Sequence, residues 1–273
     1  MKTVYFGTSA FAGAVLERLS ASDHRPALVI TRPDRAQGRG RKLTPPPVAE
    51  VARALGASVY QPEAVNADEV LERIAAAGAQ ALVVCAYGAL IGRQLLDSYP
   101  VFNVHPSLLP RWRGAAPVER AILAGDTHTG VSIMRLTEGL DSGPVCLAEK
   151  LEIMPADDYG SLAAKLQRLG GELLVQTLDG NLAGLPQSDQ GVTYAEKISA
   201  ADRLLDPAEP AAARVRRVRA LSPHIGAFEQ LDNGERLLVW EAAAQDGEFK
   251  PVVVQPAGKR RMSIDEYRRG LRR

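Results

Sequence analysis

Cysteine is scarce in this 273-residue sequence, in which only Cys85 and Cys146 occur. Apolar residues flank both of them, so we expect two buried thiols in a reducing compartment and not a disulfide scaffold. No cysteine and histidine residues cluster at the spacing of a zinc site. The scarcity of such ligands leads us to expect a protein without a metal centre.

Apolar runs long enough to cross a membrane are also missing. A spanning helix needs roughly 18 to 20 predominantly apolar residues, and no segment approaches that length. The opening residues, MKTVYFGTSAF, lack the extended apolar region and the cleavage site of a signal peptide. We therefore expect a cytoplasmic protein that has no membrane partner.

The dinucleotide fingerprint GxGxxG is absent from the first strand and helix. A strand is predicted at residues 2–6, and a turn at Gly7 leads into an amphipathic helix over residues 10–20. The next strand, residues 27–31, ends at a basic residue and a proline where a ribose-binding acid would be expected. These absences disfavour a nicotinamide oxidoreductase.

Strands and helices alternate along the first 180 residues, which predicts an α/β fold with a Rossmann-like, mostly parallel sheet. Residues 81–86 are apolar on both faces, as in a central parallel strand. Asn66 and Glu69 have the spacing of a capping box for a helix over residues 67–77. Further strands are predicted at residues 58–60, 129–136 and 145–153, and further helices at residues 48–55, 117–125 and 157–178.

The composition changes near residue 181, where glycine, proline and aspartate replace the periodic pattern. We expect one domain over residues 1–180, a linker over residues 181–207 and a small domain over residues 208–273. The last part combines a basic helix, residues 208–221, with short strands, and Asp232-Asn233-Gly234 signals a hairpin. We expect it to be β-rich, with strands at residues 225–231, 236–241 and 249–255.

Positive charge is concentrated in two segments of a chain whose net charge is only +1. Residues 32–42 carry a net charge of +4, and residues 207–273 also carry +4. The first segment belongs to a long Pro- and Gly-rich stretch, residues 32–47, which we expect to be an irregular functional loop. The pattern fits a polyanionic partner, or equally well solvated faces and tails.

Two polar side chains share one face of a predicted buried strand, residues 101–105. Asn103 and His105 are two residues apart, and side chains alternate between the faces of a strand. The Pro-rich segment over residues 106–110 must leave the sheet, because proline cannot donate to a strand ladder. An amide and an imidazole therefore point together from a strand end, where open α/β sheets bind ligands.

A carboxylate follows at Asp141, in the turn LDSGP after another apolar strand. An amide donor, an imidazole and a carboxylate form a plausible set for acyl transfer. The spacing alone leaves a second interpretation open, in which His105 is a core histidine and Asp-Ser-Gly is an ordinary turn.

The segments NVHPSLLPRWRGAAP and GVSIMRLTEGLDSGP together resemble the active-site signature of the folate-dependent formyltransferases, and most closely that of the members that formylate tRNA. The family signature consists of an asparagine, a histidine, an SLLP segment and a later aspartate. The resemblance places these at Asn103, His105, residues 107–110 and Asp141. The basic PDR…GRG segment within residues 32–47 and the terminal QPAGKRRM segment resemble the same members.

The resemblance implies transfer of the formyl group of 10-formyltetrahydrofolate to the α-amino group of methionine on initiator tRNA, for translation initiation. Folate and initiator methionyl-tRNA are the implied partners, and we expect a monomer. In such a reaction Asn103 would donate to the oxyanion, and His105 would be a second donor or a proton carrier. Asp141 would orient His105 or a water and collect the proton of the amine.

The resemblance also implies binding residues for both substrates. The tRNA contact would come from the basic loop, with Arg39 between its two glycines as the leading position. The AYG segment would wall the pterin pocket mainly through backbone groups. The implied folate-binding residues are Tyr87, Gly88, Ala89, Ser107, Leu108, Leu109 and Pro110, and the implied tRNA-binding residues are Arg35, Arg39, Arg41 and Lys42.

The C-terminal part departs from the family pattern. The family has a fuller, OB-like β-barrel with extra strands between the positions of Trp240 and Phe249, where this chain has only a short connection. We therefore expect a partial barrel, and tRNA contact could differ accordingly. The alternative is a formyltransferase acting on a small amine such as a nucleotide amino sugar, but the two basic segments favour tRNA. A non-catalytic RNA-binding protein would not need Asn103, His105 and Asp141 together.

Overall fold

The computed structural model describes residues 1–37, 40, 42–180 and 182–271. These residues form two compact units, each built from segments that are distant in the sequence. The first unit contains residues 1–113, 130–151 and 164–193, and the second contains residues 114–129, 152–163 and 194 onward. The domain boundaries expected at residues 180 and 207 stay a prediction. None of the helices described here is both long enough and apolar enough to cross a membrane.

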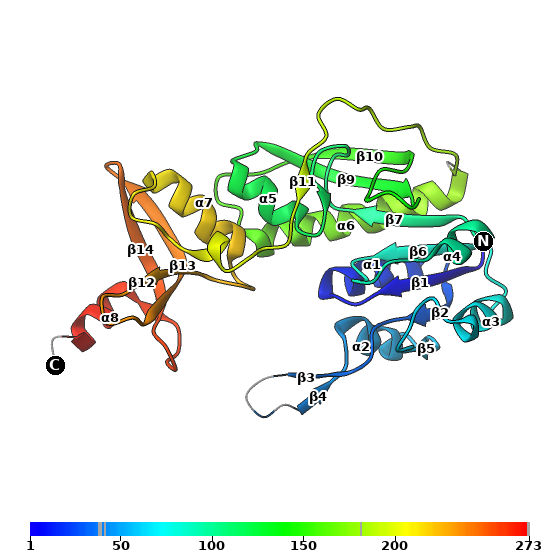
Figure 1. Cartoon of the computed structure of the whole chain (residues 1–273), viewed down its shortest axis with the longest axis horizontal. Coiled ribbons are helices and arrows are strands. Elements are labelled where there is room, and N and C mark those ends of the chain that lie inside the picture. The colour runs from blue at the N-terminus through cyan, green and yellow to red at the C-terminus, as the bar shows by residue number, and fades with distance from the viewer. Residues whose placement is uncertain (38–39, 41, 181, 272–273) are drawn as a thin grey trace. The chain divides into compact units, whose positions relative to one another are not determined.

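A seven-stranded sheet with the order β5-β2-β1-β6-β7-β9-β10 forms the centre of the first unit (Figure 1). The strands from β5 to β7 pair in parallel, and β9 pairs antiparallel with β7. The expected α/β fold with a mostly parallel sheet is therefore confirmed. The strands are β1 (Thr3–Gly7), β2 (Pro26–Ile30), β5 (Val59–Tyr60), β6 (Ala81–Cys85), β7 (Val101–His105), β9 (His128–Arg135) and β10 (Val145–Glu152).

Helices connect these strands. The side chain of Ser9 caps α1 by accepting a hydrogen bond from the Ala12 N–H, so the predicted start of this helix is correct. Gly170 lets α6 approach β7 closely, because a Cβ at this position would lie 2.8 Å from a Val104 methyl group. The helices of the chain up to this point are α1 (Ala10–Ser20), α2 (Pro47–Ala54), α3 (Asp68–Ala76), α4 (Arg93–Ser98), α5 (Pro117–Ala124) and α6 (Tyr159–Gly180).

The central strands β1 and β6 are buried on both faces, as their continuous apolar sequences predict. On one face, Val4, Phe6, Leu82 and Val84 form a core cluster with Ile74 of α3. Each such side chain contributes roughly 1.5–3 kcal/mol when it is fully buried. The loops that follow these strands therefore start from a firmly packed sheet edge.

Asn66 does not cap α3, so this part of the sequence prediction is wrong. No side chain caps the helix. The Asn66 amide donates to the Leu90 carbonyl at 3.1 Å, and its oxygen accepts from the Gly92 N–H at 2.7 Å. The loop after β6 satisfies both the donor and the acceptor of the amide, whereas an N-cap uses only the oxygen.

The basic segment over residues 32–47 contains a β-hairpin (Figure 1), which corrects the expectation of an irregular loop. β3 (Arg35–Gln37) pairs antiparallel with β4 (Lys42–Thr44). Gln61 fixes the base of the hairpin, because its Nε2 donates to the Arg32 carbonyl at 2.9 Å and to the Asp34 carboxylate at 2.7 Å. Strands of three residues without apolar alternation give no strand signal in the sequence.

The second unit contains a four-stranded antiparallel sheet of order β12-β13-β14-β15, which confirms the expected β-rich C-terminal region. β13 passes into β14 through Asp246 and Gly247, whose φ angles of 52° and 77° suit a two-residue hairpin turn. Helix α7 packs against β13. The elements are η1 (Ala201–Arg203), α7 (Ala211–Leu221), β12 (Ala227–Gln230), β13 (Arg236–Gln245), β14 (Glu248–Gln255), β15 (Met262–Ser263) and α8 (Ile264–Leu271), and β8 (Arg113–Gly114) pairs with β11 (Tyr194–Ala195).

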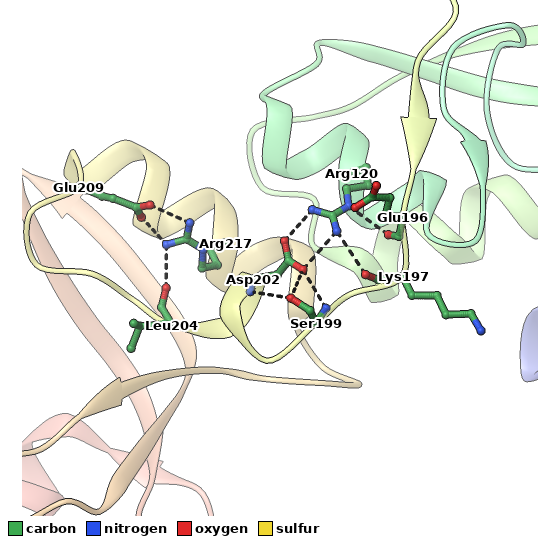
Figure 2. A network of polar contacts seen from close by, with 8 residues as sticks. All are labelled: Arg120, Glu196, Lys197, Ser199, Asp202, Leu204, Glu209 and Arg217. Carbon is green, nitrogen blue, oxygen red and sulfur yellow. Dashed lines mark hydrogen bonds and ion pairs between the residues drawn. The ribbon is translucent and has the colours of Figure 1, made fainter.

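Arg120 of α5 binds the segment that precedes and forms η1 (Figure 2). Its guanidinium donates to the Asp202 carboxylate oxygens at 2.7 and 3.2 Å and to the carbonyls of Glu196 and Lys197. The same carboxylate accepts from the backbone and the hydroxyl of Ser199. These contacts, and the hydrogen bond from Arg120 above all, lower the pKa of Asp202 to about 2.

The basic helix α7 uses its arginines inside the second unit. Arg217 forms an ion pair with Glu209, which lowers the pKa of that carboxyl, and donates to the Leu204 carbonyl at 2.8 Å (Figure 2). This positive charge therefore stabilises the unit internally. The other three arginines of the helix make four contacts, from Arg214 to the Glu229 carboxylate, from Arg216 to the Leu123 carbonyl, and from Arg219 to the carbonyls of Asp157 and Met154.

Candidate active site

The C-terminal end of β7 presents the amide and the imidazole that the sequence places on one face. Asn103 is 9% exposed and His105 is 4% exposed. They alternate with Val104, which faces Gly170 of α6 on the other side of the sheet. Among the residues that the structure describes, none forms a hydrogen bond with the Asn103 side chain. Its amide N–H groups are thus available to a bound molecule.

His105 lies between a backbone carbonyl and a carboxylate. Its Nε2 is 2.8 Å from the Trp112 carbonyl oxygen, and its Nδ1 is 3.6 Å from Oδ2 of Asp141. A carbonyl oxygen can only accept, so Nε2 carries the hydrogen of this bond. The remaining ring nitrogen therefore faces Asp141. The structure thus brings together Asn103, His105 and Asp141, which are spread over 39 residues of the sequence.

The turn that carries Asp141 has a restricted backbone. Asp141 has a φ of 43°, in the left-handed region that residues with a side chain seldom occupy. Two residues later, a Cβ on Gly143 would lie 1.9 Å from the Arg135 carbonyl oxygen. Only glycine fits this close approach, and the Asp141 side chain is held at 13% exposure. The sequence DSG is therefore more than an ordinary surface turn.

The segment over residues 107–110 is fixed by hydroxyl groups. The fully buried Ser107 donates its hydroxyl hydrogen to the Arg111 carbonyl at 2.6 Å. Ser132 of β9 donates to the Ser107 carbonyl at 2.7 Å and accepts from the Leu109 N–H at 3.1 Å. Leu108 packs against Gly130. The hydroxyl, the N–H and the carbonyl of Ser107 are all engaged in these contacts, so this residue shapes the loop.

The loop after β6 also presents backbone more than side chains. Tyr87 is buried, and its ring lies edge-on to the Phe6 ring with 5.5 Å between the ring centroids. The Tyr87 carbonyl accepts a hydrogen bond from the Thr8 hydroxyl. Burial raises the pKa of the Tyr87 phenol. Gly88 is exposed and has a φ of 79°, and Ala89 is partly exposed. This geometry agrees with contact through backbone groups, while the Tyr87 side chain belongs to the core.

Two of the four predicted tRNA-binding residues lie on the β3–β4 hairpin. Arg35 and Lys42 are exposed, and the register places them on the same face of the hairpin. The structure gives neither side chain an ion-pair partner within the described part of the chain. Arg39 and Arg41, the other two predicted residues, lie outside the described residues.

Four residues that support the site were not singled out from the sequence as site residues. Trp112 supplies the carbonyl that binds His105, and Thr193 accepts a hydrogen bond from the Trp112 N–H at 2.9 Å. Arg113 binds Gln187, and Gln187 in turn binds the turn at Asp141. Trp112 and Arg113 lie within the segment NVHPSLLPRWRGAAP, whose resemblance to the family signature implied no role for them.

The described residues include no group of three or more acidic, histidine or cysteine side chains that could hold a metal ion. Both cysteines are free and buried. Burial raises the pKa of Cys85 to about 12 and also raises that of Cys146. Neither thiol is therefore poised as a nucleophile at neutral pH.

A sequence profile for the family described as formyl transferase matches residues 1–178. The match spans well over half of the chain, including the sheet and the three residues at the end of β7 and in the later turn. The chain therefore belongs to the formyl transferase family.

Sequence relatives place the chain within that family. The methionyl-tRNA formyltransferase of Halorhodospira halophila is 43% identical over 301 aligned positions, which cover 99% of this chain and 96% of the relative. Within the family, this chain accordingly groups with the methionyl-tRNA formyltransferases.

Solved structures share the fold at lower identity. The methionyl-tRNA formyltransferase from Clostridium thermocellum has a TM-score of 0.65 at 12% identity, over 93% of this chain and 97% of that one. HypX from Aquifex aeolicus in complex with tetrahydrofolic acid has a TM-score of 0.69 at 14% identity. That match covers 98% of this chain but 46% of HypX, so the chain spans about half of that protein.

Proposed function

We propose that this chain transfers the formyl group of 10-formyltetrahydrofolate to the α-amino group of methionyl initiator tRNA. The observation that carries the proposal is the meeting of Asn103, His105 and Asp141 at one sheet edge, with 3.6 Å between the imidazole and the carboxylate. The 43% identity to a methionyl-tRNA formyltransferase over 99% of the chain supports the choice of acceptor.

The reaction is an acyl transfer in which one C–N bond forms and another breaks. The amine nitrogen attacks the formyl carbon, the bond from that carbon to N10 of the folate breaks, and one proton moves from the amine to N10. The side-chain amide of Asn103 would donate a hydrogen bond to the oxyanion of the tetrahedral intermediate. Loss of one such donor typically costs about 3 kcal/mol of transition-state stabilisation.

The contacts of His105 favour a role in proton transfer over a role as second oxyanion donor. Its Nε2–H is bonded to the Trp112 carbonyl, so proton exchange with a substrate would occur at Nδ1, which faces Asp141. Asp141 would receive the proton of the attacking amine, and Nδ1 of the adjacent imidazole, which is left without a hydrogen, could take that proton on in turn. No covalent nucleophile is needed, which agrees with two buried thiols that resist ionisation.

Folate binding would use the two loops at the end of β6 and β7. We propose contacts from Tyr87, Gly88 and Ala89 and from the segment over residues 107–110, mainly through backbone atoms. The exposed Gly88 and the buried Tyr87 ring support this division of roles. A neighbour in fold, HypX, has been solved in complex with tetrahydrofolic acid.

The acceptor RNA would contact the β3–β4 hairpin. Arg35 and Lys42 offer two exposed positive charges on one face, which suits the phosphates of an RNA strand. Arg39 and Arg41 are proposed to add to this contact. The connection between β14 and β15 would contribute a second contact through the exposed Lys259 and Arg260, since the α7 arginines are engaged internally. We further propose that the chain acts as a cytoplasmic monomer.

Formylation of purified tRNAs tests the proposed function. The protein is incubated with 10-formyltetrahydrofolate and, in separate reactions, methionyl initiator tRNA, methionyl elongator tRNA and a nucleotide amino sugar. Preferential formylation of the initiator is expected. Formyl transfer to the amino sugar, with neither tRNA modified, would instead establish the alternative of a small-amine formyltransferase.

A hairpin variant tests the tRNA contact. We expect Arg35→Ser combined with Lys42→Ser to raise KM for tRNA about tenfold and to weaken its dependence on salt, because fewer phosphates are neutralised. The KM for the formyl donor should not change. Lys150→Ser, at an exposed position of β10, is the control for loss of positive charge. An equal rise in KM for tRNA and for the formyl donor would contradict a tRNA contact at the hairpin.

A further inference from the structure

The segment that follows α6 contacts the turn at Asp141 and the loop after β7 within the first unit. We name residues 184–193 the strap. At one end, Leu185 exchanges two backbone hydrogen bonds of 2.8 Å with Val145 of β10. At the other end, Thr193 donates its N–H to the Pro110 carbonyl at 3.4 Å, and its own carbonyl accepts from the Arg113 N–H at 2.9 Å. The strap is thus anchored on either side of its central residues.

Gln187 lies between these anchors and uses its whole side-chain amide. Its Nε2 donates to the carbonyl oxygens of Asp141 and Gly143, both at 2.8 Å. Its Oε1 accepts from Nε and Nη2 of Arg113, at 3.0 and 2.7 Å. A carbonyl can only accept and a guanidinium can only donate, so the orientation of this amide is fixed by its partners. Gln187 therefore ties the Asp141 turn to the loop after β7.

The Asp141 turn needs such a tie. The left-handed φ of 43° at Asp141 is costly for a residue with a side chain and persists only when its surroundings hold it. Gln187 binds the carbonyls on both sides of Ser142, and these carbonyls set the direction of the peptide groups that carry Asp141. The carboxylate consequently faces Nδ1 of His105.

Thr193 supports the other partner of His105 in the same way. Trp112 also has a left-handed φ, 62°, and its N–H donates to the Thr193 hydroxyl at 2.9 Å. The Trp112 carbonyl accepts the hydrogen of His105 Nε2 and thereby orients the ring so that Nδ1, free to take a proton, faces Asp141. The two strap residues thus hold the groups on both sides of the imidazole.

We propose that Gln187 and Thr193 are positioning residues of the formyl transfer, which act by holding Asp141 and the Trp112 carbonyl against His105. This inference rests on the proposed function. Neither residue is placed against the reacting atoms, so their effect runs through the geometry of the Asn103, His105 and Asp141 set. A displacement of a catalytic group by about 1 Å can cost on the order of 100-fold in rate.

Two pairs of variants test the proposal. Gln187→Glu keeps the contact with Arg113 but replaces the donor to two carbonyls with a second acceptor, and Gln190→Glu introduces the same charge at an exposed strap position. Thr193→Val removes the hydroxyl at constant size, whereas Thr193→Ser retains it. We expect Gln187→Glu and Thr193→Val to lower kcat about 10- to 100-fold with KM values within about threefold of wild type. Gln190→Glu and Thr193→Ser should keep kcat within about threefold.

A double variant separates positioning from a general structural role. If Gln187 acts through Asp141, then Gln187→Glu should lower kcat much less in an Asp141→Asn background than in the wild type. The pH profile of kcat should change shape in Gln187→Glu and keep its shape in Gln190→Glu. Tetrahydrofolate affinity and Tm should be close to those of the wild type.

The outcomes distinguish failure of this inference from failure of the proposed function. A wild-type protein that formylates none of the acceptors refutes the proposed function. An active wild type together with unchanged kcat in Gln187→Glu and Thr193→Val refutes the positioning role alone. A fall in kcat that tracks lower Tm and lost tetrahydrofolate binding in both variants also overturns it, since that pattern marks a structural role.

Discussion

Replacing Asp202 with asparagine removes the carboxylate that Arg120 binds in the segment before α7. Both oxygens of that carboxylate accept a hydrogen bond from the guanidinium, and one of them also accepts from the Ser199 N–H. An asparagine would turn an NH2 group toward donors that need an acceptor. We therefore expect Asp202→Asn to lower the stability of the second unit.

The lowered pKa gives the size and the pH range of the effect. The pKa of Asp202 falls from its ordinary 3.8 to about 2. Each pKa unit corresponds to 1.36 kcal/mol, but the side chain is 22% exposed and partly screened, so we expect about 1–2 kcal/mol at pH 7. Because the folded pKa is the lower one, this stabilisation is present above about pH 4 and is lost as the pH falls toward 2.

Urea unfolding followed by tryptophan fluorescence measures this effect. Trp112 lies in the first unit and Trp240 in the second, so a Trp112→Phe background reports on the second unit alone. Asp232→Asn is the matched control, because Asp232 is exposed and forms no ion pair within the part of the chain that the structure describes. Equal stability of Asp202→Asn and its parent at pH 7, or a difference that stays constant between pH 4 and pH 2, would refute the reasoning.

Two further predictions concern buried groups. Burial raises the pKa of Cys85 to about 12 and also raises the pKa of Cys146. The folded protein should therefore not react with a disulfide reagent at pH 8, whereas both thiols should react in urea. Rapid stoichiometric reaction of the folded chain would contradict the burial of the thiols. Gly143→Ala should lower kcat at least tenfold, because its Cβ would lie 1.9 Å from the Arg135 carbonyl and displace the Asp141 turn. Gly180→Ala, where a Cβ meets nothing within 4 Å, is the control, and equal activity of the two variants would refute this view of the turn.

Regular elements with a strong local signal were predicted from the sequence. Pro117 and Gly125 mark the two ends of α5, and the structure shows Gly125 as its left-handed C-cap with a φ of 76°. The continuous apolar run of β6 and the alternation in β7 likewise fixed a central strand and a shared face for Asn103 and His105. In each case the signal lies within a few residues of the feature that it predicts.

The contacts that were not predicted depend on residues far apart in the sequence. Gln187 lies 74 residues after Arg113, and Thr193 lies 81 residues after Trp112. The left-handed backbone at Trp112 and Asp141 has no sequence signal, because neither residue is glycine. The same reason explains Asn66, whose amide binds Leu90 and Gly92, which lie 24 and 26 residues later. Local propensity cannot rank such distant partners.

The rate of a single turnover tests the proposed roles of Asp141 and His105 in formyl transfer. Formyl transfer from 10-formyltetrahydrofolate to methionyl initiator tRNA is followed with enzyme in excess, for the wild type and for Asp141→Asn. We expect formylation by the wild type and a loss of about 100- to 10,000-fold in the rate of the variant, with tetrahydrofolate affinity and Tm retained. A variant that transfers the formyl group at close to the wild-type rate would contradict the assignment of Asp141 and His105 as the proton-transferring pair.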